Sequence, residues 1–179
     1  MVERTEITAV RLLLRPFALS DVDDVLDYTS HPDWGRYLPD PRPYTRKVAE
    51  EFLAKMVLDS WETNPSFAIV LDGNVIGNFH FNVDLKNKIA EIGYTIGRPH
   101  WGKGLAPEAA RHVVGWGFDN YDVGKVFARA QAPNERSWHV LEKLGMVREG
   151  LLRGHYLEHG EPKDYYIYGV LRDEWNTGS

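Results

Sequence analysis

The segment RPHWGKGLAPEAARHVVGWGFDNY, residues 98–121, is the most informative part of the chain. Its second half predicts an amphipathic helix, because apolar and small residues recur there at helical spacing. These residues are Ala110, Val113, Val114, Gly117, Phe118 and Tyr121. Pro107 suits the first helical position, where a backbone N–H would have no intrahelical partner. Two glycines flanking a lysine at 102–104 precede this helix, and a strand-like run over 89–96 precedes the glycines.

A strand, a glycine turn and a helix start in this order can form an anion-binding site. Backbone N–H groups of the turn and the positive end of the helix dipole point at whatever occupies it, and glycine lets a phosphate approach the backbone closely. The turn matches neither the phosphate loop GxxxxGK(S/T) nor the dinucleotide motif GxGxxG, in which Pro107 would take the place of the third glycine. An ordinary strand-to-helix turn, which needs glycine for its backbone angles, explains these residues equally well.

Composition bounds the class of protein. A length of 179 residues suits a single domain, 1–179, and the absence of cysteine excludes disulfides and thiolate metal sites. The seven histidines show no metal-binding spacing, so we expect no metal. The formal net charge of −5 argues against a nucleic-acid partner and mildly favours a cationic one such as an amine. Neither a signal peptide nor a run of transmembrane length is found, so we expect a cytoplasmic protein without a membrane partner.

Hydrophobic periodicity and turn residues predict an α/β (α+β) fold with a central mixed, mostly antiparallel sheet of about seven strands and with about four helices. The expected strands cover residues 8–17, 66–71, 75–83, 89–96, 125–131, 146–157 and 163–171. The expected helices begin at Ser20, Thr45, Pro107 and Asn134, three of which are typical N-cap residues.

Residues 31–43 contain four prolines and a glycine and are therefore expected to form a loop. This loop also carries the apolar residues Trp34, Tyr37 and Leu38. They either tuck the loop onto the core or wall a substrate pocket, since loops on a rigid scaffold commonly shape a pocket.

The strand at 75–83 has one apolar and one polar face. The apolar face carries Val75, Gly77, Phe79, Phe81 and Val83, and the other face carries Asn78, His80 and Asn82 together with Ile76. If residues 85–88 form the loop, Asn82 lies opposite Glu91 and His80 opposite Gly93, which adds Glu91 to the polar row. A polar row on a central strand is uncommon unless that face lines a cleft.

The run WGKGLA at 101–106 resembles the pyrophosphate-binding motif (Q/R)xxGx(G/A) of the GNAT superfamily of acyl-coenzyme-A-dependent N-acyltransferases, with Trp101 in place of Gln or Arg. The form WGKGxAxEA and the ending DYYIYGVLRDEW at 164–175 are similar to the RimJ/RimL-like branch, and the run NxxS followed by LEKLGM at 134–146 is similar to the family's region after the fifth strand. Order and spacing agree over residues 11–175.

The resemblance implies a GNAT-like domain that uses acetyl-CoA as co-substrate, and no metal, to acetylate a primary amine on a protein N-terminus or a small molecule by direct attack on the thioester. The alternative is a catalytically silent domain that binds acyl-CoA as a sensor or scaffold. The identity of the acceptor, any acyl preference beyond acetyl and the oligomeric state stay open.

Amine acylation needs a base for the amine, donors for the oxyanion and an acid for the leaving thiolate. The resemblance implies Glu91, acting through a water, as the base; the alternative is that Glu91 only forms hydrogen bonds in the polar row. It implies Ser137 as the acid; the alternative is that Ser137 caps its helix. His155 is a rival base, since related enzymes can place a glutamate there, and Asp164 would lie opposite and orient the imidazole. The alternative for His155 is a ring whose hydrogen bonds are satisfied inside its hairpin.

The resemblance also implies how the coenzyme is held. Backbone N–H groups of the glycine turn would bind the pyrophosphate, residues 94–96 would pair with the pantetheine arm as an added strand, and Asn134 would cap its helix or bind a pantetheine amide. The implied coenzyme-binding residues are Tyr94, Thr95, Ile96, Arg98, Trp101, Gly102, Lys103, Gly104, Leu105, Ala106 and Asn134.

Overall fold

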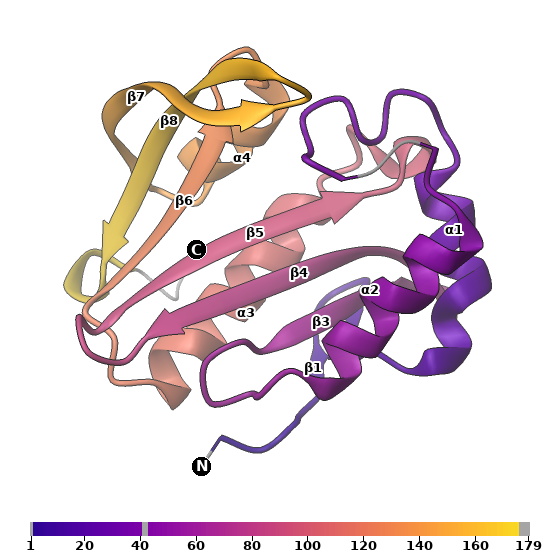
Figure 1. Ribbon diagram of the computed structural model, residues 1–179. Coiled ribbons are helices and arrows are strands. Elements are labelled where there is room, and N and C mark those ends of the chain that lie inside the picture. Colours follow the sequence, from indigo (N-terminus) through magenta and orange to yellow (C-terminus); the bar gives the residue numbers. More distant parts are fainter. Residues whose placement is uncertain (1, 41–42, 176–179) are drawn as a thin grey trace.

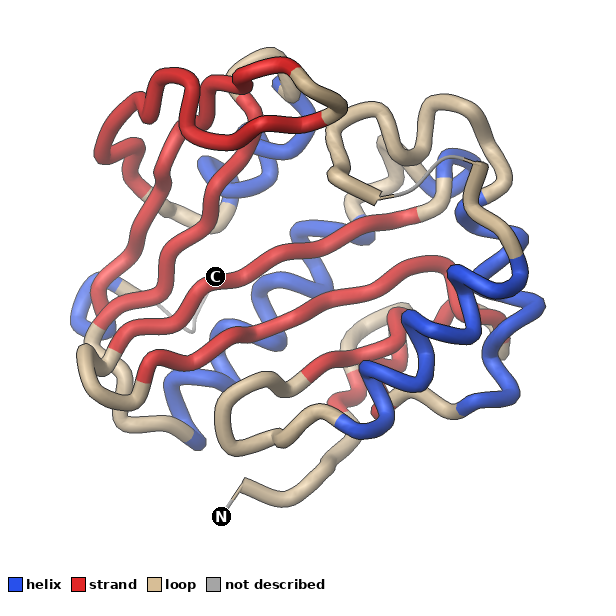
Figure 2. Tube along the Cα trace, in the orientation of Figure 1, coloured by secondary structure: helices blue, strands red, loops and turns tan. Residues whose placement is uncertain are grey.

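The computed structural model describes residues 2–40 and 43–175, so two residues of the expected loop 31–43 lie outside the described ranges. Its centre is an eight-stranded sheet with the order β1-β2-β3-β4-β5-β6-β8-β7 (Figures 1 and 2). The strands are β1 (Ile7–Thr8), β2 (Leu13–Pro16), β3 (Ser66–Leu71), β4 (Asn74–Asp84), β5 (Ile89–Ile96), β6 (Lys125–Gln131), β7 (Val147–Glu158) and β8 (Glu161–Leu171). The α-helices of the described ranges are α1 (Val22–Thr29), α2 (Arg46–Leu58), α3 (Leu105–Asn120) and α4 (Glu135–Lys143). Neighbouring strands pair antiparallel except β5 and β6, so the expected fold class is confirmed.

The expected strand over residues 8–17 is in fact two strands, β1 and β2, which accounts for the eighth strand. A tight turn joins them, closed by a hydrogen bond from Ala9 N–H to Leu12 O at 2.9 Å. No glycine, proline or asparagine marks this turn in the sequence. A distant contact holds it instead, because Arg11 donates its backbone N–H and its Nε–H to Glu108 of α3 at 2.6 and 2.7 Å.

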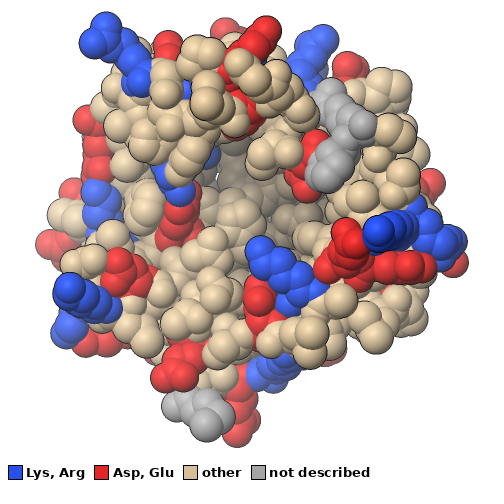
Figure 3. Space-filling view, in the orientation of Figure 1, with Lys and Arg blue, Asp and Glu red and all other residues tan. Residues whose placement is uncertain are grey.

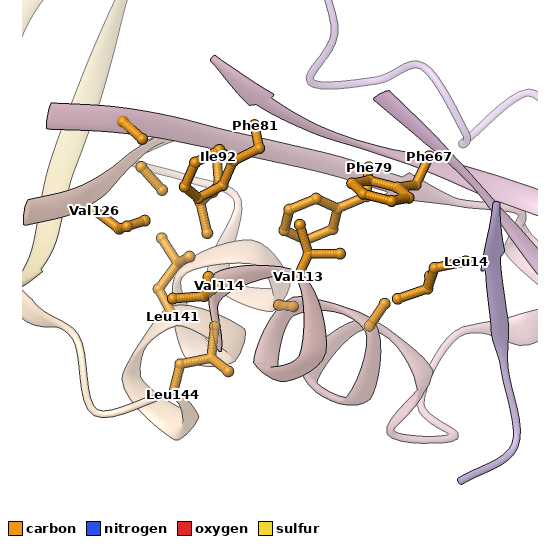
Figure 4. Packing of buried hydrophobic residues seen from close by; sticks show 14 of the residues in the cluster. Leu14, Phe67, Phe79, Phe81, Ile92, Val113, Val114, Val126, Leu141 and Leu144 are labelled. Carbon is orange, nitrogen blue, oxygen red and sulfur yellow. The ribbon is translucent and has the colours of Figure 1, made fainter. Parts of the chain in front are cut away.

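The helices lie in two layers, with α3 and α4 on one face of the sheet and α1 and α2 on the other (Figures 1 and 2). The larger core cluster fills the space between the sheet and α3, where Phe67, Phe79 and Phe81 meet Val113 and Val114 (Figure 4). All five side chains are fully buried. Burying each one stabilises the fold by about 1.5–3 kcal/mol.

The apolar stripe predicted for α3 is confirmed, since all six of its residues are buried. Gly117 has a specific place in this stripe, because a Cβ there would collide with the ring of Phe81. The glycine therefore lets α3 approach the sheet at the point where the aromatic ring projects from β4.

The start of β4 departs from the predicted alternation. The ladder pairs Ile69 with Gly77 but Val70 with Val75, which leaves Ile76 as the extra residue of a β-bulge. Val75 therefore packs in the smaller core cluster under α1 and α2, whereas Ile76 joins the cluster under α3. The sequence analysis had placed Val75 on the apolar face with Phe79 and Phe81, and Ile76 on the polar face, so both predictions were wrong. The alternation expected for the rest of the strand holds.

The start of the first helix also differs from the prediction. A short 3₁₀ turn at Leu19–Asp21 precedes α1, and the side chain of Asp21, not that of Ser20, holds the start of this turn. Asp21 accepts a hydrogen bond from Ala18 N–H at 2.8 Å and two from the guanidinium of Arg15 at 2.8 and 2.9 Å. Because Arg15 lies on β2, the position of the Asp21 side chain depends on a residue outside the helix, which the pattern of the helix residues could not predict.

The other helix starts follow the sequence more closely. Thr45 and Asn134 cap α2 and α4 as predicted. Helix α3 begins at Leu105, so Pro107 is its third residue instead of its first, still within the turn where no intrahelical N–H partner is required. None of the helices in residues 2–40 and 43–175 is long and apolar enough to cross a membrane.

Candidate active site

The two parallel strands at the centre of the sheet separate part-way along their length. The pairing of β5 with β6 ends where Ile92 lies opposite Ala128. Residues 93–96 keep their partners on β4, and residues 129–131 keep theirs on β8, so a gap opens between the strands (Figure 1). An extended ligand can pair with such a free edge as an added strand. The edge at 94–96 is the one that the family resemblance implies for the pantetheine arm.

A cleft of about 750 Å³ lies at this gap, with walls from residues within 33–38, 94–107 and 133–143. In the space-filling view the molecule is hollowed beside the β7–β8 hairpin (Figure 3). Every residue predicted to bind the coenzyme lines the cleft except Lys103. Ser137 lines it as well, whereas Glu91 and His155 are not among its lining residues.

The glycine turn has the backbone geometry of an anion site. Gly102 and Gly104 both have φ of 75°, in the left-handed region that favours glycine. The Lys103 carbonyl between them accepts a hydrogen bond from Nη1 of Arg11 at 2.9 Å, so the contact that holds the β1–β2 turn also holds this one. The first N–H groups of α3 have no intrahelical partner, and the positive end of its dipole lies at the cleft.

Trp101 occupies the motif position where the family pattern has Gln or Arg. Its indole N–H donates to the carbonyl of Ile96 at 2.6 Å and so fixes the end of β5 to the glycine turn. Two guanidinium groups lie near its ring, with the Cζ atoms of Arg98 and Arg136 at 4.9 and 4.7 Å from the ring centroid. The tryptophan therefore stands where the family motif has one polar side chain, and its ring contacts the guanidinium groups of Arg98 and Arg136 at the cleft.

The cleft has unsatisfied polar atoms and a positive balance. Arg98 Nε and His100 Nδ1 are buried and have no hydrogen-bond partner among the described residues. The nearest carboxylate oxygen to Arg98 Nε, on Asp33, is 4.0 Å away. Four Lys or Arg side chains and two Asp or Glu side chains line the cleft, although the whole chain carries a formal charge of −5. Buried unpaired donors are costly, so the arrangement fits an anionic ligand.

Ser137 lies in the first turn of α4. Its backbone N–H donates to Asn134 Oδ1 at 3.4 Å, so Asn134 is the cap and the serine hydroxyl is free of that task. The Ser137 hydroxyl lies 3.4 Å from the phenol oxygen of Tyr94, and the phenol donates to the Ser137 carbonyl at 2.9 Å. Burial raises the pKa of Tyr94, which keeps the phenol protonated. Two hydroxyl groups thus meet on one wall of the cleft.

Glu91 lies on the face of β4 and β5 that carries Asn78, His80, Asn82 and Glu91, here called the polar face, and it lies opposite Asn82 as predicted. Arg129 of β6 donates Nε to one carboxylate oxygen at 2.7 Å and Nη2 to the other at 2.6 Å. Both side chains are about three-quarters buried, with exposed fractions of 24% and 25%. Such a bidentate pair holds the carboxylate in one orientation. The role of Glu91 as a base stays a prediction.

His155 lies on β7, exposed to solvent. Its expected support by Asp164 is wrong, because the ladder has a bulge there and the Asp164 carboxylate accepts from Gly154 N–H at 2.7 Å. The His155 ring instead lies 3.4 Å from Nη1 of Arg129. Gly154 has φ of 55°, and its N–H points toward the aspartate in this conformation. No pattern in the sequence predicted it.

Two side chains near Glu91, His80 of the polar face and Arg129 of β6, had no chemical role in the sequence-based prediction. His80 lies opposite Gly93 as the predicted register required, and its ring covers Gly93 so closely that a Cβ there would collide with it. Burial lowers the pKa of the His80 imidazole. The histidine–glycine pair was the available signal, because a ring needs the space that a missing side chain leaves. No pattern in β6 marked Arg129.

Comparisons with known proteins bear on the whole of this arrangement. Residues 11–147 match the family model described as an acetyltransferase (GNAT) domain. The uncharacterized N-acetyltransferase p20 of Bacillus licheniformis is 34% identical over 170 residues, which cover 92% of this chain and 95% of that protein. The ribosomal protein uS5-alanine N-acetyltransferase of Escherichia coli (strain K12) is 28% identical over 87 residues, 49% of this chain and 45% of that protein.

Among solved structures, the crystal structure of an acetyltransferase (GNAT family) from Bacillus anthracis superposes with a TM-score of 0.86 at 30% sequence identity. The match covers 95% of this chain and all of that one, 100%. The resemblance found in the short motifs therefore extends to the complete arrangement of strands and helices.

Proposed function

The chain belongs to the GNAT acetyltransferase family, and from this premise we propose that it transfers the acetyl group of acetyl-CoA directly to a primary amine. The observation that carries the proposal is the gap between β5 and β6, because it lies between the cleft and the polar face. A thioester in the cleft and an amine on the polar face can meet in this gap. The chain has no cysteine that could carry the acetyl group as an intermediate.

The residues present fit acetyl-CoA. The pyrophosphate would be bound by N–H groups of the glycine turn and of the α3 start, with Arg98 Nε and His100 Nδ1 as further buried polar atoms in need of a partner. The pantetheine arm would pair with the free edge at 94–96. The positive lining of the cleft favours a polyanionic ligand in a protein whose formal charge is −5.

The side chains of the cleft supply the acid half of the reaction. Ser137 would give a proton to the departing thiolate, and the Tyr94 phenol beside it could replace that proton. A backbone N–H on the free edge of β5 would stabilise the oxyanion of the tetrahedral intermediate. On the polar face a base must make the amine neutral, since only a neutral amine has a free lone pair, and Glu91 is the base that the family resemblance implies.

The acceptor we propose is a primary amine on a protein N-terminus or on a small molecule. The Escherichia coli relative is named for acetylating an alanine of a ribosomal protein, which supports the first of these two classes. Helices α1 and α2 lie over only part of the polar face (Figure 1), and a recess of about 300 Å³ lies on it beside α2.

The test combines acetyl-CoA binding by calorimetry with release of coenzyme A, measured by a thiol reagent, over a panel of acceptors. The panel contains short peptides that begin with alanine, serine or threonine, together with spermidine and free amino acids. Binding with acceptor-dependent release supports the proposal. Binding without release for any acceptor would favour the silent acyl-CoA-binding domain, an alternative consistent with the ion-paired state of Glu91. Absence of binding would overturn both.

A further inference from the structure

We propose that His80 is the catalytic base that takes the proton from the acceptor amine. The assignment rests on the acetyl transfer proposed above and moves the role implied for Glu91 to a side chain of the neighbouring strand. Four features support it: the place of the ring at the gap, its free nitrogens, the recess that leads to it, and the charges around it.

The ring of His80 lies at the narrow end of the gap. β5 and β6 are last paired at Ile92 and Ala128, so Gly93 is the first residue of β5 beyond the ladder. His80 lies directly across from Gly93 and its ring covers the glycine. An amine that attacks a thioester held at this edge therefore approaches next to the imidazole.

The ring nitrogens of His80 are free, whereas the oxygens of Glu91 are not. Within the described residues the imidazole of His80 takes part in no hydrogen bond or ion pair. Both carboxylate oxygens of Glu91 accept hydrogen bonds from Arg129, at 2.6 and 2.7 Å. A base needs a lone pair that can reach the substrate. Each Glu91 oxygen has one lone pair engaged by Arg129, whereas no donor among the described residues engages the lone pair of the neutral His80 ring.

A recess gives an acceptor access to this ring. It has a volume of about 300 Å³ and lies between α2 and β4, with His80 in its wall. Its polar groups include the side-chain amides of Asn64, Asn78 and Asn82. These amides can bind polar groups of an acceptor from the side of the sheet opposite to α3, while the coenzyme enters from the cleft.

The charged groups that face His80 come from three elements. Lys55 of α2 lowers the pKa of the imidazole, Glu91 of β5 raises it, and burial lowers it more than either charge changes it. Asp59, just after α2, lines the same recess, and Arg129 of β6 pairs with Glu91. The net direction is downward, so the ring is neutral near pH 7 and ready to accept a proton. The carboxylate of Glu91 then stabilises the imidazolium that forms.

The proton balance closes with the groups present. The ammonium form of the acceptor loses two protons when it becomes an amide. The first goes to His80 and from there to solvent, which frees the lone pair that forms the C–N bond. The second goes from the nitrogen to His80, which has by then released the first, after the attack has formed the C–N bond. The C–S bond breaks as Ser137 gives its proton to the sulfur. The serine is reprotonated from solvent or through Tyr94.

The test compares His80→Gln with Glu91→Gln, using the panel acceptor that gives the highest turnover with the wild-type protein. His112→Gln is the matched control, because His112 lies on α3, where its Nδ1 contacts the Glu108 carbonyl at 2.9 Å. For each protein we would measure kcat/KM from pH 5 to 9, acetyl-CoA affinity and the melting temperature. Should His80→Gln fail to fold, His80→Gly with added imidazole provides the second measurement.

We expect His80→Gln to lower kcat/KM by about 10²–10⁴-fold, the usual contribution of a positioned base, with unchanged acetyl-CoA affinity. The wild-type profile should fall on its acid side below pH 6.5, the ordinary histidine value, because the pKa of His80 is lowered. This fall should be absent in His80→Gln. In Glu91→Gln it should move to still lower pH, because the charge that raises the pKa is gone, and the loss of kcat/KM should be smaller. In His80→Gly, imidazole should restore turnover.

Wild-type kcat/KM in His80→Gln, or a larger loss in Glu91→Gln than in His80→Gln, would overturn the assignment. A loss of activity in His80→Gln that comes with an equal loss of coenzyme affinity would make the residue structural, and so would failure of imidazole to act on His80→Gly. If the wild-type protein itself transfers no acetyl group to the panel, the proposed function fails and the assignment falls with it. If wild type and His80→Gln transfer equally, only the assignment fails.

Discussion

The two faces of the central sheet hold two halves of the candidate active site that are built in different ways. On the side of α3 and α4 the site consists mainly of backbone: a glycine turn, the start of a helix and the free edge of a strand. On the polar face it consists of side chains that meet across strands, such as Glu91 with Arg129 and His80 with Gly93. A backbone site follows from a short local motif, whereas a side-chain site exists only when separate strands adopt the correct register.

The difference has a physical consequence for substitution. Backbone donors survive the loss of a single side chain, so coenzyme binding in the cleft should tolerate truncation of a side chain and be sensitive to added bulk. Removal of one partner of the Glu91–Arg129 ion pair should be destabilising, because the charge of the other partner is left partly buried and unpaired. The following substitutions test the cleft side of this contrast, and the His80 and Glu91 variants described above test the polar face.

The largest effect is expected for Gly104→Glu. Gly104 has φ of 75°, where a residue with a Cβ costs about 1–2 kcal/mol, and the new carboxylate would lie where the pyrophosphate is expected. Apart from the neighbouring backbone, the one described atom within 4 Å of the added Cβ is Nη2 of Arg11, at 3.6 Å, so the fold should survive. Calorimetry should detect no acetyl-CoA binding. Gly104→Ala is the control, since it carries the strain without the charge and should bind weakly; unchanged affinity in folded Gly104→Glu would break the comparison.

Ser137→Ala should come second. The variant lacks the proton donor for the thiolate, so turnover should fall by about 10²-fold, the lower end for a positioned acid, while acetyl-CoA affinity stays the same. An acyl donor whose thiol is more acidic than that of coenzyme A needs less help and should recover part of the rate. Steady-state turnover with both donors is the measurement. Full turnover in Ser137→Ala would direct attention to Tyr94, whose phenol lies beside the serine.

Asn134→Ala should have a smaller effect, and on stability instead of chemistry. Its side chain caps α4, and loss of such a cap typically costs about 1 kcal/mol of the free energy of unfolding. Ser137→Ala should cost less, because the Ser137 hydroxyl does not cap the helix. Thermal or denaturant melts of the two variants give the ranking, and the reverse order would mean that the serine has a structural role.

Lys103→Ala should have the smallest effect. Its carbonyl is held by Arg11, but its side chain is exposed and does not line the cleft. We expect acetyl-CoA binding to weaken by less than about 1 kcal/mol, as for other exposed charges. A loss as large as that of Gly104→Glu, measured in the same calorimeter, would show that the cleft depends on this side chain after all.

Local patterns predicted most of the fold and about half of the site. The stripe of α3, the Thr45 and Asn134 caps and the pairing of His80 with Gly93 all follow from spacing within one or two neighbouring elements. The errors in the strands have two causes, a distant contact and an extra residue in one strand. Glu108 holds the turn that divides the first strand, and the β-bulges at Ile76 and near Gly154 shift one strand against its partner.

The site divides along the same line. The residues predicted to bind the coenzyme line the cleft, apart from Lys103. They could be predicted because a short continuous segment determines the geometry of a backbone motif. The ion pair of Arg129 with Glu91 could not be predicted, because it joins residues that are 38 positions apart and whose strands stay together only as far as Ala128. The support expected from Asp164 failed for a similar reason, since one bulge redirected its carboxylate to a backbone N–H.

The contact of Arg11 with Glu108 and the Lys103 carbonyl also has a meaning for the biogenesis of the protein. The partners are 97 residues apart, and a ribosome that adds about 5–20 residues per second releases Arg11 many seconds before Glu108. During that time the N-terminal hairpin lacks its contact with Glu108. The glycine turn is synthesised later and forms its contact with an Arg11 that is already present. Coenzyme that binds the glycine turn would then also stabilise the N-terminal hairpin, because Arg11 of that hairpin contacts the turn.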